Sequence, residues 1–170
     1  AVGKILRNCI DDVHLTIDAM DPVEADLALL LDNLHGRVAD PLQRAGVSLR
    51  WQVPDLPRLD WLDPRCALHI LRILQEALTN ATRHTQADDI ALRAVADATG
   101  VTLHLCDNGP GFDPDQALHN GGRGLRNQLR RADAIGARLH WQQGAAAPGR
   151  AGTCVTLWLP LRRPAAVGPA

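Results

Sequence analysis

The chain has 170 residues, of which 46% are hydrophobic and 22% charged, and its formal net charge is -1. This length suits one domain with a sizeable core plus an appendage, and the composition is typical of a soluble globular protein. The near-neutral charge and the aromatic content of 3% argue against a nucleic-acid-binding protein, because such proteins present basic surfaces or stacked aromatic rings. No run of about 18 apolar residues is present, so we expect no membrane contact within the chain.

Residues 2–20 are predicted to form a helix that packs on a partner helix. Their apolar residues recur at alternating steps of four and three, the heptad pattern of such helices: Leu6, Ile10, Val13, Ile17 and Met20. An ordinary amphipathic helix lying on its own domain is the alternative. The first residues, Ala1 to Lys4, are not a signal peptide and include no initiator Met. We therefore expect the chain to be a piece of a longer protein.

A second helix is expected to begin at Asp21-Pro22 and to end near Gly46. Asp21 can cap this helix, a proline suits its first position, and Glu24 occupies the capping-box position. Its apolar residues form one face, which is the pattern of a helix packed on a core. Those residues are Val23, Leu27, Leu30, Leu31, Leu34 and Val38.

The rest of the chain alternates strands, helices and loops. The expected elements are a strand at 47–53, a loop at 54–64, a helix from Asp63-Pro64 to about residue 85, strands at 88–97 and 101–106, a helix at 124–135, and strands around 139–141 and 155–159. Residues 162–170 form a Pro/Ala tail that we expect to be disordered. The adjacent strand pairs favour an α+β fold, a two-layer sandwich with helices on one face of a sheet, because a doubly wound sheet would alternate more strictly.

The four cysteines are far apart in the sequence and form no CxxC pair: Cys9, Cys66, Cys106 and Cys154. This spacing argues against a metal site and against a disulfide framework. We expect all four to be small buried apolar side chains in a protein of the reducing cytosol.

The third helix carries polar residues at helical spacing. Glu76, Asn80 and either Arg83 or His84 share one face. An Asn carbonyl together with phosphate oxygens can hold Mg²⁺, a carboxylate can orient or deprotonate a nucleophile, and a cation can neutralise phosphate. A solvated polar face is the alternative.

A glycine-rich turn, Asp107-Asn108-Gly109-Pro110-Gly111-Phe112, directly follows a strand. Asp107 continues the parity of Val101, Leu103 and Leu105, so its carboxylate is expected to point inward, where it needs a donor such as the amino group of adenine. Gly109 and Gly111 let the backbone approach a flat ring. An ordinary Asp-Asn-Gly turn between strands is the alternative.

Two further glycine segments follow this turn. Gly122 and Gly124 stand at the start of a helix, where free backbone N–H groups can receive phosphate. Gly152-Thr153 precedes the last strand, and Thr153 can hydrogen-bond a base directly or through water. A helix that simply starts after a loop, and a strand threonine of no special role, are the alternatives.

In this order, the motifs resemble the ATP-binding domain of sensor histidine kinases, within the wider ATPase group that includes Hsp90, DNA gyrase and MutL. Residues 75–84 look like the N box of that family, 107–112 like its first glycine box, and 122–125 and 152–153 like its later ones. The resemblance covers residues 47–161. It is closer to the subfamily with a short lid, here 113–121, which is often paired with response regulators carrying helix-turn-helix domains.

The resemblance implies roles for individual residues. Asn80 is expected to hold Mg²⁺, Glu76 to be the base or orienting group in phosphoryl transfer, and Asp107 to read the adenine amino group of ATP. The residues expected to shape the pocket and lid are Gly109, Gly111, Gly122, Gly124 and Leu125, and Thr153 is expected to contact the base. Arg83 stands where the subfamily often has a Lys near phosphate, with His84 beside it. No Walker A motif is present, so a P-loop enzyme is excluded.

The resemblance also implies a domain organisation. Residues 1–21 look like the second helix of a dimerisation and phosphoacceptor hairpin, 22–161 like the ATPase domain, and 162–170 like a tail. The helix with the reactive histidine is expected to be absent, and His14 lacks the neighbouring acid typical of a phosphoacceptor. His14 is therefore expected to be a surface or interface residue.

The implied activity is that of a cytosolic protein histidine kinase. It would pass the γ-phosphoryl group of ATP to a histidine for relay to the receiver domain of a response regulator, and would form a homodimer through the hairpin. Another ATPase of the same fold, such as an anti-sigma-factor serine kinase or a chaperone-like clamp, is one alternative. A degenerate docking module is the other, against which the intact Glu76, Asn80 and Asp107 argue.

Overall fold

The structure is a computed structural model that describes residue 4 and residues 25–83, 87–144 and 151–163. The expected helix at 2–20, its residue His14 and most of the expected tail at 162–170 lie outside these ranges. The domain boundaries expected near residues 21 and 162 therefore remain predictions. No helix in the described ranges is both long and apolar enough to cross a membrane.

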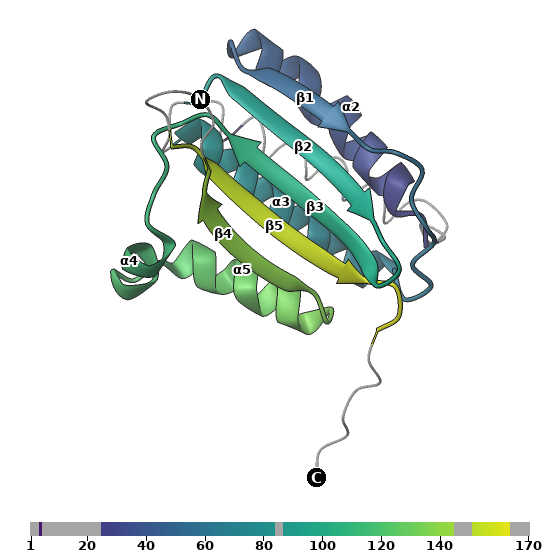
Figure 1. The fold of residues 1–170 in the computed structure, drawn as a ribbon. Helices are drawn as coiled ribbons and strands as arrows, with labels where there is room; N and C mark the ends of the chain where they lie inside the picture. The colour runs from purple at the N-terminus through teal and green to yellow at the C-terminus, as the bar shows by residue number, and fades with distance from the viewer. Residues whose placement is uncertain (1–3, 5–24, 84–86, 145–150, 164–170) are drawn as a thin grey trace.

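Five strands form one mixed sheet in the order β1-β2-β3-β5-β4 (Figure 1). They are β1 (Ser48–Gln52), β2 (Asp89–Ala96), β3 (Gly100–Asp107), β4 (Arg138–Gln143) and β5 (Thr153–Pro160). β1 runs parallel to β2, because α3 connects them, and every other pair is antiparallel. The last strand in the sequence thus lies between β3 and β4.

The long helices cover one face of this sheet (Figure 1). They are α2 (Leu27–Arg44), α3 (Pro64–Arg83) and α5 (Arg123–Ala134), with the short α4 (Pro114–His119) just before α5. Alternate residues of the inner strands are buried beneath the helices, among them Leu92, Leu103 and Leu157. In the described part of the chain, the opposite face carries no helix. The expected two-layer α+β sandwich is confirmed.

Side-chain caps set the starts of α2 and α3. α3 begins as expected, since Asp63 Oδ1 accepts a hydrogen bond of 2.7 Å from Cys66 N at the helix start. The expected start of the preceding helix at Asp21 is wrong. Asp26 is the N-cap of α2 and accepts from Leu29 N at 3.0 Å, and Ala25 before it has a φ of 55°, which breaks helical geometry.

The segment between the turn at 107–112 and α5 contains a helix that the sequence analysis did not predict. Asp113 caps α4 by accepting from Asp115 N and Gln116 N, and Pro114 takes the first helical position. The helix has only six residues and none of them is buried, so it has no apolar stripe from which periodicity could predict it.

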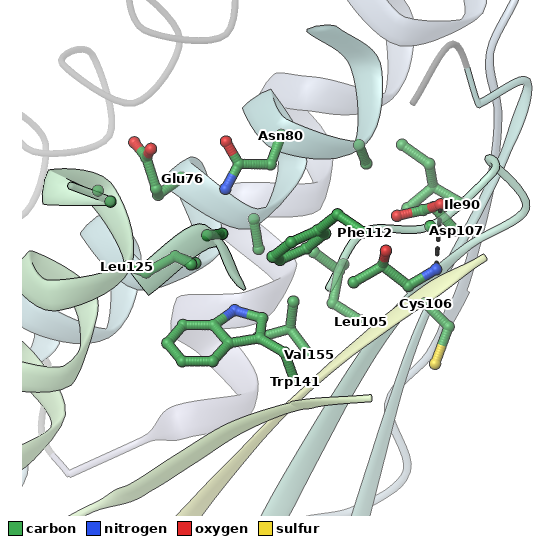
Figure 2. Close-up of a pocket in the computed structure, with 17 residues that line it drawn as sticks. Glu76, Asn80, Ile90, Leu105, Cys106, Asp107, Phe112, Leu125, Trp141 and Val155 are labelled. Carbon is green, nitrogen blue, oxygen red and sulfur yellow. Dashed lines mark hydrogen bonds between the residues drawn. The ribbon is translucent and has the colours of Figure 1, made fainter. Parts of the chain in front are cut away.

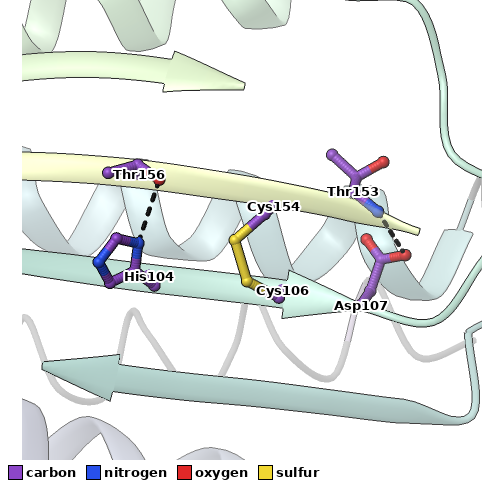
Figure 3. Close-up of a disulfide and its surroundings, with 6 residues drawn as sticks. All are labelled: His104, Cys106, Asp107, Thr153, Cys154 and Thr156. Atoms are coloured by element: carbon purple, nitrogen blue, oxygen red, sulfur yellow. Dashed lines mark hydrogen bonds between the residues drawn. A yellow bond between two sulfur atoms is a disulfide. The ribbon is translucent and has the colours of Figure 1, made fainter. Parts of the chain in front are cut away.

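The expectation for the cysteines is wrong for two of them. Cys106 and Cys154 form a disulfide across β3 and β5 (Figure 3). They are far apart in the sequence but opposite each other in the antiparallel register, and pairing of this kind cannot be read from spacing. Cys66 is buried and unpaired as expected, and Cys9 lies outside the described residues. No group of three or more metal-ligating side chains occurs in the described ranges.

Candidate functional site

A cavity of about 390 Å³ lies between α3, the sheet and the segment that contains α4 (Figure 2). Its large apolar side chains come from four strands, from α5 and from the loop after β3. The side chains concerned are Ile90, Leu105, Phe112, Leu125, Trp141 and Val155. Polar groups occur at its two ends, so the cavity suits a ligand with a flat apolar portion and a polar, extended portion.

Asp107 stands at one end of the cavity, where β3 ends. Its Oδ1 accepts hydrogen bonds from the backbone N–H groups of Gly109, at 2.8 Å, and Thr153, at 3.3 Å. These two donors come from the turn and from β5, so they fix the carboxylate relative to both (Figure 3). A fixed carboxylate inside an apolar cavity is suited to accept hydrogen bonds from an amino group of a ligand.

Thr153 offers a second polar atom at this end. The residue is only 4% exposed, it lines the cavity, and its Oγ1 has no hydrogen-bond partner in the structure. A buried hydroxyl without a partner is unfavourable by about 1–3 kcal/mol, which a ligand or a bridging water would relieve. Thr153 therefore fits a contact with a polar atom of a bound ring.

The turn at Asp107 is closed by glycine. Gly111 has a φ of 78°, and a Cβ atom at this position would lie 2.8 Å from Gly152 O. Gly109 O accepts a hydrogen bond of 2.7 Å from Gly152 N, which ties the turn to the segment before β5. Only glycine combines this conformation with so close an approach of two backbone segments.

The other end of the cavity is polar. Glu76 and Asn80 lie one turn apart on α3, and both side chains point to the side of the cavity away from Asp107 (Figure 2). The start of α5 faces them: a Cβ atom on Gly124 would lie 2.8 Å from Glu76 Oε1. No side chain caps α5 at Gly122, so its N-terminal N–H groups suit an anion.

The structure thus brings together most of the residues that the sequence singled out. Those that line the cavity are Glu76, Asn80, Asp107, Gly111, Gly122, Gly124, Leu125 and Thr153. Gly109 does not line it, but it positions Asp107 and Gly152. The side chain of Arg83 and the whole of His84 lie outside the described part of the chain, so their expected contact with phosphate stays a prediction.

Sequence reasoning missed part of the apolar wall. Trp141 of β4 and Ile90 of β2 line the cavity, yet each occupies an inward position in an alternating strand. In the sequence such residues look like any other core residue. Phe112 could have been identified from the sequence, because an aromatic side chain beside a ring-binding turn can stack on the bound ring.

Comparison with known proteins identifies the family of the chain. Residues 66–163 match the family model for histidine kinase-, DNA gyrase B-, and HSP90-like ATPases. The chain belongs to this family. The matched range begins at the first turn of α3 and ends after β5, so it contains the whole cavity. Within the family, the chain is an ATP-binding catalytic domain of the type found in two-component sensor histidine kinases.

Curated relatives are sensor kinases. The chain is 30% identical over 154 residues to the nitrate/nitrite sensor protein NarQ of Escherichia coli, covering 89% of the chain and 24% of NarQ. It is 31% identical over 140 residues to the sensor histidine kinase LnrJ of Bacillus subtilis, covering 81% of the chain and 32% of LnrJ. The chain therefore spans only about a quarter to a third of the length of these relatives.

Solved structures show the same fold. The histidine kinase domain of the blue-light activated histidine kinase from Erythrobacter litoralis aligns with a TM-score of 0.67 at 20% identity, over 93% of this chain and 74% of that one. The ATP binding domain of PrrB from Mycobacterium tuberculosis aligns with a TM-score of 0.58 at 25% identity, over 86% of this chain and all of that domain.

Proposed function

We propose that this domain binds Mg-ATP in the cavity and transfers the γ-phosphoryl group to a histidine, as the catalytic part of a two-component sensor kinase. One observation carries the proposal: a single apolar cavity holds a fixed carboxylate and an unpartnered hydroxyl at one end, and Glu76, Asn80 and a helix start at the other. A nucleotide triphosphate has the same division between a flat ring and a charged, extended tail.

The Asp107 end is the proposed adenine site. The Asp107 carboxylate would accept a hydrogen bond from the exocyclic amino group of adenine, and Thr153 Oγ1 would bond a ring nitrogen directly or through water. Guanine presents a carbonyl oxygen at the corresponding position, and that oxygen would face the Asp107 carboxylate without a donor between them. The domain is therefore proposed to prefer ATP to GTP.

The Glu76 end is the proposed phosphate site. The amide oxygen of Asn80 is a hard ligand of the kind that Mg²⁺ accepts alongside phosphate oxygens and water. When bound, the ion would offset the charge of the phosphates. Glu76 would orient or deprotonate the attacking histidine, while the N–H groups at the start of α5 and the cations of Arg83 or His84 would contact phosphate oxygens.

The phosphoryl group needs an acceptor and a destination. We propose that a histidine on a helical hairpin receives it and passes it to the receiver domain of a response regulator. The hairpin would also form the homodimer of the full-length protein, with residues 1–21 as part of it. The domain would then work in the cytosol, within a sensor that can carry a membrane anchor elsewhere.

Calorimetry with ATP and Mg²⁺ tests the proposal, with Asp107→Asn as the decisive variant. An Asn oxygen can still accept from Gly109 and Thr153, so the turn should persist, while the charged acceptor for adenine is lost. We expect binding to weaken about 10- to 100-fold, the range for a hydrogen bond to a charged group. Asp133→Asn, an exposed carboxylate of α5 away from the cavity, is the matched control and should bind as the parent does.

Two outcomes would contradict the proposal. A parent protein that is folded by circular dichroism but binds neither ATP nor ADP would indicate a docking module instead of a kinase domain. If the parent and Asp107→Asn bind ATP with equal affinity, Asp107 does not contact the adenine ring.

A further inference from the structure

The disulfide between Cys106 and Cys154 lies directly behind the candidate ATP site. It joins β3 to β5 at a pair of opposed residues whose Cα atoms are 4.0 Å apart. Leu105 and Asp107 point toward the cavity, so the intervening Cys106 side chain points to the helix-free face of the sheet. Both cysteines are partly exposed, so a small reagent can reach them, and Cys106 is also one of the residues that line the cavity.

The residue next to each cysteine belongs to the proposed adenine site. Asp107 follows Cys106, Thr153 precedes Cys154, and Asp107 Oδ1 accepts from Thr153 N at 3.3 Å (Figure 3). One residue further from the disulfide, Gly152 N donates a hydrogen bond of 2.7 Å to Gly109 O. The covalent bond between the strands therefore lies one residue from the contacts that hold the adenine-reading carboxylate in place.

The face of the sheet that carries the sulfur atoms also carries charged residues. Arg93 and His140 lie on the same face of the sheet, where they flank His104 and Thr156 in the strand register. Burial, together with the charges of Arg93 and His140, lowers the pKa of His104 below its usual value. The guanidinium of Arg93 favours the thiolate form of a nearby cysteine, which is the reactive form in disulfide exchange, while the Asp89 carboxylate on the same face is paired with Arg50.

We propose that Cys106 and Cys154 form a reversible redox modification site, whose oxidised state holds the adenine end of the cavity in its binding geometry. The reacting partners are low-molecular-weight disulfides and dithiols. This inference rests on the proposed function, because its effect is read as a change in ATP affinity.

The exchange needs no group beyond the two cysteines and a small disulfide, RSSR. One cysteine thiolate attacks RSSR, forming a protein–SR mixed disulfide and releasing RS⁻. The second cysteine thiolate attacks the protein sulfur of that bond and releases the other RS⁻. The two thiol protons end on the released thiolates, so two protein thiols are oxidised to one disulfide and RSSR is reduced to two RSH. A dithiol reverses the reaction.

The disulfide should raise the affinity for ATP because of the two strands that it connects. The residues between the two cysteines include α4, α5 and β4, so the disulfide joins the two ends of the stretch that supplies Phe112, Leu125 and Trp141 to the cavity. In the reduced protein the ladder and the hydrogen bond between Thr153 and Asp107 remain, but no covalent bond supports them, so the two strand ends separate more often. Binding must then first restore the site, so the reduced state should have lower affinity.

The experiment compares the same 170-residue protein in two redox states. One sample is equilibrated with glutathione disulfide and the other with dithiothreitol. Mass spectrometry of peptides should find the 106–154 linkage only in the first sample. The dissociation constant for Mg-ATP, from calorimetry, should be about three- to tenfold higher in the dithiothreitol sample. The double variant Cys106→Ala/Cys154→Ala should bind like the reduced parent under both conditions.

Cys66→Ala provides the matched control, since Cys66 is buried and unpaired, and it should keep the full redox response. Absence of the 106–154 linkage under oxidising conditions would overturn the proposal, as would equal ATP affinities in the two states. The decisive comparison uses the parent chain, so it holds even if the double variant folds poorly.

Failure of the proposed function would be recognised separately. If ATP binds neither state, the ATPase assignment fails, and amide hydrogen exchange decides the redox inference alone. The N–H groups of Gly109, Gly152 and Thr153 should exchange more slowly in the oxidised protein. Equal exchange rates of these amides in the oxidised and reduced protein would overturn the redox inference.

Discussion

Gly111 is the residue at which the backbone of the turn is most constrained. Its φ of 78° and the predicted 2.8 Å contact of an added Cβ with Gly152 O leave no room for a side chain. We expect Gly111→Ala to destabilise the fold by about 1–3 kcal/mol and to weaken ATP binding, because the turn can no longer hold Asp107 toward the ring.

Urea unfolding and calorimetry check this prediction, with Gly36→Ala as the matched control. Gly36 lies inside α2 and an added Cβ would meet nothing within 4 Å. Alanine there should raise the free energy of unfolding by up to about 1 kcal/mol. A Gly111→Ala protein as stable as the parent would show that the turn adapts easily.

Asn80 is the residue on which the proposed Mg²⁺ contact depends. Asn80→Ala removes the amide oxygen from the polar end of the cavity and leaves the adenine end intact. ATP should therefore bind the variant with about the same affinity in Mg²⁺ and in EDTA, whereas the parent should bind about tenfold more tightly with Mg²⁺. Asn127→Ala, at an exposed position of α5, should keep the dependence on Mg²⁺. Calorimetry in the two buffers measures the difference.

At the scale of elements, the N-cap of α3 supports the helix that carries Glu76 and Asn80. The hydrogen bond from the backbone of Cys66 holds the pKa of the Asp63 carboxyl below its usual value of 3.8. A carboxylate with a lowered folded-state pKa stabilises the fold above its unfolded pKa, and this contribution is lost as the pH falls through the folded value. Asp63→Ala should therefore cost about 1 kcal/mol at neutral pH.

The pH dependence separates this cap from ordinary surface charge. The stability difference between the parent and Asp63→Ala, measured by urea unfolding, should be constant near neutrality and should shrink below about pH 3.8. Asp60→Ala removes an exposed carboxylate of the preceding loop and should have little effect at any pH. If the stability difference between the parent and Asp63→Ala does not shrink in acid, the substitution destabilises the fold through lost packing and not through the lost cap.

The sequence predicts elements well where a long apolar stripe or a side-chain cap is present. The start of α3 at Asp63-Pro64 is confirmed because the residues that signal it also make the capping bond. The predicted start of α2 is wrong because Asp21, followed by Pro22 and Glu24, has the stronger capping pattern in the sequence, whereas Asp26 makes the capping bond in the structure. Most residues of the predicted site lie around one cavity, since helical and strand periodicity fix which side chains face inward, while their roles stay predictions.

At the scale of the whole molecule, phosphoryl transfer depends on an acceptor. Incubation with γ-labelled ATP should leave this chain unlabelled, because His14 lacks the acidic neighbour expected of an acceptor histidine. Gel autoradiography under alkaline conditions, which preserve phosphohistidine, checks this. Label that disappears in His14→Gln would contradict the prediction, and ATP binding by the same sample confirms that the protein is competent.

Relations between distant segments are what the sequence alone does not supply. The placement of β5 between β3 and β4, the opposition of Cys106 and Cys154, and the contribution of Trp141 to the cavity all follow from the sheet order. Spacing along the chain contains no signal for them, since each depends on which strands become neighbours.

The sheet order also matters while the protein is being made. β4 leaves the ribosome before β5, yet its described strand neighbour is β5 alone. Until β5 inserts, β4 has no strand to pair with, and the carboxylate of Asp107 lacks the N–H of Thr153. A nascent chain or a message truncated before residue 153 therefore yields no smaller working version of the domain. It leaves an open β3 edge, a surface that chaperones recognise and that promotes aggregation.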